Sequence, residues 1–107
     1  MTQYQVQLTE HANKGLEIIY QHYLVRVNDQ LANKLLEEIE EAIHILSSQP
    51  LIGHLPKELA LTDIDCLELL TKSFRLIYRI DSTNVYIMTI LHQKQSIAKA
   101  ATARLLD

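Results

Sequence analysis

Two arginines and a histidine in the last third of the chain have side chains suited to chemistry. Arg75 and Arg79 lie four residues apart in one apolar segment, and His92 and Lys94 follow at the end of the next. A guanidinium binds a phosphate or a carboxylate through paired hydrogen bonds, and an imidazole titrates near neutral pH. The group therefore suits a site that binds phosphate or carboxylate. The alternative is structural: the arginines pair with local carboxylates such as Glu68, and His92 is only a polar strand end.

Acid-base chemistry, a metal or a cofactor would need further residues. Glu58, Tyr78 and Tyr86 have side chains that could assist His92 as a general base, but the sequence does not place them near it. The five histidines have no close ligand spacing with Cys66, so we expect no metal site. The chain has no phosphate-binding glycine loop, and we expect no cofactor. Cys66 is expected to be a small buried strand residue, because no basic cluster flanks it.

The composition indicates one small globular domain. A chain of 107 residues that is 48% hydrophobic and 21% charged has the size of a single folded domain, expected to span residues 1–107. A net charge of −3 argues against a protein that coats nucleic acid, because such binding relies on many Lys and Arg contacts with phosphates. One cysteine, no apolar leader in residues 1–10 and no membrane-length apolar stretch predict a cytoplasmic protein with no membrane partner.

The first half of the chain predicts a strand and two helices. Residues 3–8 alternate polar and larger side chains, which is typical of a half-buried strand. Thr9 can cap a helix that runs to about Val25, and Asn28 with Asp29 can start a second helix that ends at residues 47–50. The glutamates at 37, 38, 40 and 41 are interpreted as a solvated face. The apolar stripe of the second helix consists of Leu31, Leu35, Ile39, Ala42, Ile43 and Leu46.

The second half predicts a loop over residues 51–65, with a short helical turn near 57–61, then strands at 66–71, 74–80 and 85–91 and a last helix at 96–106. The expected fold class is α+β: a small antiparallel sheet packed on an N-terminal helical hairpin, in the order β-α-α-β-β-β-α. Alternation along the middle strand directs Phe74, Leu76 and Tyr78 toward the helices. It directs Arg75 and Arg79 toward an open face, so loss of the Arg75 side chain is expected to spare the fold.

Several motifs, taken in order, resemble one family of small toxins. Residues 73–80 read Ser-Phe-Arg-Leu-Ile-Tyr-Arg-Ile, an aliphatic strand follows at 85–91, residues 92–95 read His-Gln-Lys-Gln, and residues 104–106 read Arg-Leu-Leu. In the loop, Gly53 precedes the run Leu-Pro-Lys-Glu-Leu at 55–59. Over essentially its whole length, the chain resembles toxins of the RelE/ParE superfamily of type II toxin-antitoxin systems, and ParE-like members in particular.

The resemblance implies a growth-inhibiting toxin that binds a target such as DNA gyrase. It also implies neutralisation by a cognate antitoxin, with which the toxin forms a hetero-oligomer. Arg75 matches the family's recurrent strand arginine, and Arg75, Arg79, His92 and Lys94 are the expected target-binding residues. One alternative is a RelE-type endonuclease that cleaves mRNA on the ribosome, without a metal, using Arg75, His92 and Lys94. Another is an inactive remnant that acts only as a binding module.

One departure from the family pattern bears on these alternatives. Many relatives carry a basic run where residues 93–95 of this chain read Gln-Lys-Gln. Cleavage of RNA needs several cations to stabilise the charge that develops on the attacked phosphate. The departure therefore favours a toxin that binds its target over one that cuts RNA.

A second expected surface lies on the helical hairpin. Ile18, Leu24, Val25 and Leu36 fall beside or outside the main apolar stripes. Exposed apolar patches commonly mark interaction sites, so we expect an amphipathic helix of the antitoxin to bind there. The alternative is that the loop of residues 51–65 folds over these side chains.

Overall fold

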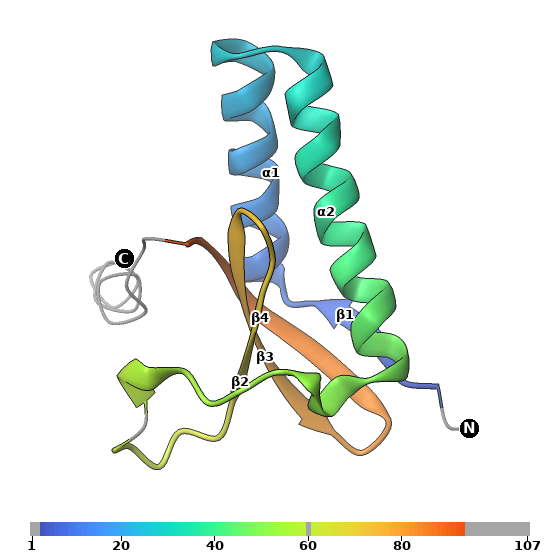
Figure 1. The fold of residues 1–107 in the computed structure, drawn as a ribbon, viewed down its shortest axis with the longest axis vertical. Coiled ribbons are helices and arrows are strands. Elements are labelled where there is room, and N and C mark those ends of the chain that lie inside the picture. Colours follow the sequence, from blue (N-terminus) through green and yellow to red (C-terminus); the bar gives the residue numbers. More distant parts are fainter. Residues whose placement is uncertain (1–2, 60, 94–107) are drawn as a thin grey trace.

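The computed structural model describes residues 3–59 and 61–93 (Figure 1). The chain forms strand β1 (Gln5–Leu8), helices α1 (Glu10–Arg26) and α2 (Asp29–Ser48), short 3-10 turns η1 (Pro50–Ile52) and η2 (Lys57–Leu59), and strands β2 (Leu67–Leu70), β3 (Phe74–Asp81) and β4 (Asn84–His92). The α+β class and the order β-α-α-β-β-β are confirmed. The helix expected at residues 96–106 lies outside the described residues.

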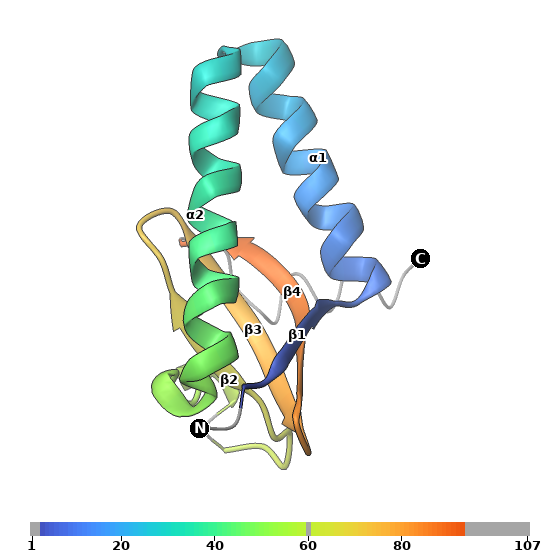
Figure 2. The ribbon, with the colours of Figure 1, turned by 90° about the vertical axis from the view of Figure 1, so that its right-hand side faces the viewer.

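Both helices begin at the residues that the sequence indicates. The Thr9 hydroxyl accepts a hydrogen bond from the Ala12 N–H at 3.2 Å, and the Asn28 side chain accepts one from the Leu31 N–H at 2.8 Å. These caps satisfy backbone donors that have no partner inside the helix. The two helices form a hairpin whose far end, at the connection between α1 and α2, extends beyond the sheet (Figures 1 and 2).

The sheet has the strand order β1-β4-β3-β2. Strand β3 pairs antiparallel with both β2 and β4, whereas β1 pairs parallel with β4 through Val6 beside Val85 and Leu8 beside Ile87. The sheet is therefore mixed, and the expectation of an all-antiparallel sheet is wrong for its first strand. The alternation of side chains predicts which face of a strand is buried, but it does not predict the neighbour or the direction of that strand.

The main core lies between the helices and one face of the sheet. Phe74, Leu76 and Tyr78 of β3 are fully buried there, as their alternation predicts. Against them pack residues of the predicted α2 stripe, including Leu35, Ile39, Ala42 and Leu46. Among residues 3–59 and 61–93, no helix combines the length and the apolar character that crossing a membrane requires.

The other face of the sheet is partly covered, not open. Leu59, from the loop between α2 and β2, packs against a small buried cluster of Cys66, Ile77 and Leu91. Burial raises the pKa of the Cys66 thiol, and the nearby carboxylates Asp65 and Glu68 raise it further. A raised pKa keeps the thiol protonated, which agrees with the expected structural role of this cysteine.

Candidate functional site

Arg75 lies at the centre of a buried cluster of charges. Its Nε donates a hydrogen bond to Glu68 Oε2 at 2.6 Å, and its Nη1 and Nη2 donate to the two carboxylate oxygens of Glu58, both at 2.8 Å. The exposed fractions of the side chains are 10% for Arg75, 6% for Glu68 and 21% for Glu58. The expectation that Arg75 projects into solvent is therefore wrong. The alternative, pairing with Glu68 on the neighbouring strand, is confirmed.

The cluster is built from three elements that are far apart in sequence. Arg75 comes from β3, Glu68 from β2 and Glu58 from the 3-10 turn η2. The hydrogen bonds that Arg75 donates to Glu58 are the largest cause that raises its pKa, the bond to Glu68 raises it further, and burial acts in the opposite direction. The guanidinium thus stays charged and holds two carboxylates. An additional anion at Arg75 would meet these two negative charges.

A second set of contacts anchors the same loop to the sheet. The Tyr78 hydroxyl donates a hydrogen bond to the Pro50 carbonyl at 2.6 Å and accepts one from the Gly53 N–H at 3.0 Å. Beside it, the backbones of His54 and Glu68 exchange hydrogen bonds of 3.0 and 2.7 Å. A Cβ atom on Gly53 would lie 2.7 Å from the Glu68 carbonyl oxygen, so this close approach requires glycine.

His92 and Arg75 lie on opposite faces of the sheet. His92 pairs across the strands with Phe74, which faces the helices, and its ring meets the Phe74 ring edge-on at 5.6 Å. Its Nε2 is 3.4 Å from the hydroxyl oxygen of Tyr23 on α1. Arg75 points instead toward the loop and Glu58. The described structure therefore does not bring the expected arginine and histidine together, and Lys94 lies outside the described residues.

Two of the residues considered for acid-base work, Glu58 and Tyr78, are bound to other groups. Glu58 binds Arg75, and the Tyr78 hydroxyl binds the loop backbone. Arg79 is exposed near the far end of β3, where it pairs with Tyr86 of β4. Within the part of the chain that the structure describes, no three His, Cys, Asp or Glu side chains gather as metal ligands would.

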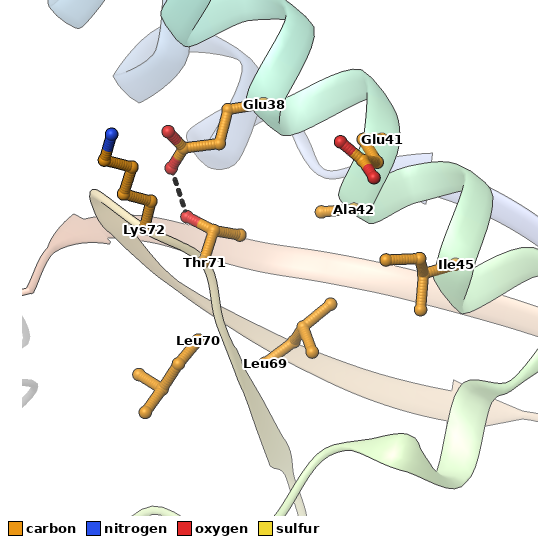
Figure 3. Close-up of a pocket in the computed structure, with 8 residues that line it drawn as sticks. All are labelled: Glu38, Glu41, Ala42, Ile45, Leu69, Leu70, Thr71 and Lys72. Atoms are coloured by element: carbon orange, nitrogen blue, oxygen red, sulfur yellow. Dashed lines mark hydrogen bonds between the residues drawn. The ribbon is translucent and has the colours of Figure 1, made fainter.

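Glu38 has a role that the sequence interpretation missed. Its carboxylate accepts hydrogen bonds from the Ser73 N–H at 2.8 Å and the Ser73 hydroxyl at 3.1 Å. It accepts another from the Thr71 hydroxyl (Figure 3). These bonds hold the turn between β2 and β3 against α2, beside a hollow of about 240 Å³. The signal was present: Glu38 is three residues after Leu35 and four before Ala42, on the buried side of α2 and not on its solvated side.

The expected antitoxin surface lies on the hairpin and is not covered by the loop. Ile18 and Val25 are 70% and 77% exposed, whereas Leu24 and Leu36 are half-buried. The loop between α2 and β2 lies instead against the face of the sheet that carries Arg75. The alternative, in which the loop of residues 51–65 folds over the hairpin side chains, is therefore wrong.

Comparison with known proteins agrees with this geometry. Residues 6–97 match the family described as "ParE toxin of type II toxin-antitoxin system, parDE". A comparison with curated protein sequences gave no match.

Three solved structures are similar to the chain. The chromosomal ParDE system of P. aeruginosa contains a chain with 20% identity and a TM-score of 0.68, covering 86% of this chain and 98% of its own. The RelBE2 toxin-antitoxin complex of Mycobacterium tuberculosis gives 27% identity and a TM-score of 0.58, over 85% and 99% of the two chains. The isolated E. coli RelE toxin gives 16% and 0.52, over 97% and 99%. The resemblance to the RelE/ParE superfamily is confirmed, and the chain belongs to the ParE toxin family of type II toxin-antitoxin systems.

Proposed function

We propose that this toxin arrests growth in the cytoplasm by binding a protein target such as DNA gyrase, and that a cognate antitoxin neutralises it in a hetero-oligomer. Two of the similar structures come from toxin-antitoxin systems or complexes, which supports an antitoxin partner. Arg79, His92 and Lys94 are proposed contacts with the target. Arg75 contributes through the loop that it holds in place.

One observation carries the preference for binding over RNA cleavage: the placement of Arg75. Metal-independent cleavage of RNA needs a cation at the attacked phosphate and an acid or base within hydrogen-bond reach of the same atoms. Here two carboxylates occupy the Arg75 guanidinium, and His92 lies on the opposite face of the sheet. A binding mechanism needs neither a solvent-facing Arg75 nor a neighbouring histidine.

The test compares the two activities with one purified preparation. A gyrase supercoiling assay and a primer-extension assay of mRNA in a translating extract are run across the same range of toxin concentrations. We expect inhibition of supercoiling and no new mRNA ends. Ribosome-dependent cleavage without gyrase inhibition would establish the RelE-type alternative. Expression without growth arrest would favour the inactive remnant.

A further inference from the structure

The loop between α2 and β2 exposes an unusual share of the aliphatic side chains. Among the described residues, nine large hydrophobic side chains are exposed, and five of them lie in residues 51–65. Leu61 is 101% exposed, Leu51 79% and Ile64 54%. A loop that only covered the sheet would turn such side chains inward, because each one gains stability from burial.

The loop is nevertheless held in a defined shape. The Tyr78 hydroxyl, the backbone of Glu68 and the Arg75 guanidinium anchor it at Gly53, His54 and Glu58. Burying three charged side chains costs desolvation, and such clusters often stabilise a fold no better than apolar residues would. Anchors of this kind fix the position of the loop, with its aliphatic side chains directed outward.

The charges around these side chains indicate the chemistry of the partner. Asp63 and Asp65 are exposed, and neither forms an ion pair within the described part of the chain, whereas Lys57 is the exposed cation of the loop. Glu58 is bound by Arg75, so the exposed Asp, Glu, Lys and Arg side chains of the loop are two aspartates and one lysine, which are net negative. A hollow of about 440 Å³ continues from Ile64 and Asp65 to Arg79, the arginine already proposed as a target contact.

We propose that the exposed aliphatic side chains of residues 51–65 form the surface through which the toxin docks on its protein target. The matching target surface has apolar hollows bordered by Lys and Arg, because both the aliphatic side chains and the unpaired aspartates then find partners. The inference rests on the proposed binding function. The surface is separate from the hairpin residues Ile18 and Val25, which lie on helix α1.

The test uses a double variant of the full chain, Leu61→Ser with Ile64→Ser, and the matched control Val27→Ser. Val27 is an exposed aliphatic residue after α1, on the hairpin and outside the proposed docking surface. We expect the double variant to need roughly tenfold more toxin for the same growth arrest, with an unchanged Tm and an unchanged Kd for the antitoxin. The control should arrest growth as the parent does. Equal growth arrest by the double variant at equal abundance would overturn the inference.

Charge reversal tests the partner's chemistry separately. Asp63→Lys with Asp65→Lys should weaken inhibition of the purified target more at low than at high ionic strength, because the double variant places cations against the Lys and Arg of the target surface. Stronger inhibition by the charge-reversal variant would show that the target surface is not bordered by Lys and Arg. If the parent fails to inhibit gyrase, the proposed target is wrong, but the growth-arrest assay still tests whether the loop contributes to toxicity. If the parent and the loop variant inhibit gyrase equally, the docking surface is wrong and the binding function stands.

Discussion

Burial gives a structural role to Arg75, a residue whose guanidinium could otherwise bind a ligand. In the structure its guanidinium joins β2, β3 and the loop, through Glu68 on one side and Glu58 on the other. Removing this shared cation takes a charged partner from both carboxylates in a poorly solvated site, where Glu68 keeps a contact with His54 Nε2 at 3.1 Å. Stability and function are therefore coupled at this residue. Its substitution acts directly on the position of the loop and only through the loop on the binding of a ligand.

Arg75→Ala is expected to destabilise the fold by about 3 to 5 kcal/mol, since Glu58 and Glu68 lose their common cation. The free energy of unfolding from urea titration measures the loss. Arg79→Ala is the matched control on the same strand: its side chain is exposed, and a change within about 0.5 kcal/mol is expected. A similar small loss for both variants would show that the cluster contributes little to the fold.

Tyr78 gives the fold a dependence on alkaline pH. Burial raises the pKa of its phenol above the ordinary value of 10.0, although the hydrogen bond from the Gly53 N–H lowers it in part. The folded state therefore holds this proton more tightly than the unfolded chain does. The corresponding stability is fully present below pH ~10 and is lost as the pH rises through the higher, folded-state pKa.

Tyr78→Phe is expected to cost about 1 to 3 kcal/mol at neutral pH, because the Pro50 carbonyl and the Gly53 N–H lose their partner. The difference from the parent should shrink at pH ~11, because the phenol of the unfolded parent, with an ordinary pKa of about 10, is then ionised. Urea titrations at both pH values measure it. Tyr20→Phe, whose hydroxyl bonds at an exposed site, should show neither effect. A constant difference at both pH values would contradict the proposed role of the phenol.

Residue-level roles were predictable where strand alternation decided them. The face of β3 that carries Arg75 and its pairing with Glu68 both follow from neighbouring strands. The contact with Glu58 was not predictable, because it joins β3 to a loop that has no periodic pattern and lies 17 residues earlier in the chain. A sequence shows which side chains share a face, but not which loop folds over that face.

At the scale of elements, α2 is the element whose start and buried face the sequence predicts most completely. Its cap and its apolar stripe predicted both its start and its buried face. The direction of β1 was not predictable, because β1 pairs with the last strand and no local signal records that neighbour. The loop after α2 was expected as a loop, but its anchors depend on a glycine contact with Tyr78 that only the fold creates.

Ile39→Ala tests the packing of α2 against the sheet. Ile39 is 1% exposed within the main core, so its truncation leaves a cavity and should cost about 2 to 5 kcal/mol. Chemical denaturation measures the loss, with Glu37→Ala on the exposed side of the same helix as the control. A loss below about 0.5 kcal/mol for Ile39→Ala would place this side of α2 in solvent.

At the scale of the whole molecule, the fold offers two separate surfaces. The far end of the helical hairpin extends beyond the sheet, and helix α1 of the hairpin carries Ile18 and Val25. The anchored loop lies against the opposite face of the sheet from the helices (Figures 1 and 2). An antitoxin that binds the hairpin and a target that binds the loop would therefore contact different elements. Neutralisation then requires the antitoxin either to extend to the loop or to block the target by its size.

Hydrogen exchange of the toxin with and without its antitoxin locates the first of these surfaces. The far end of the hairpin has no sheet beneath it, so its amides are expected to exchange through local opening in the free toxin. A helix of the antitoxin packed on Ile18, Leu24, Val25 and Leu36 would suppress that opening, and added protection should span residues 18–36. Amides of the buried middle strand β3 serve as the internal control, because they should exchange slowly in both states. Protection confined to β4 and the chain beyond it would show that the antitoxin does not bind the hairpin, even though the family assignment would stand.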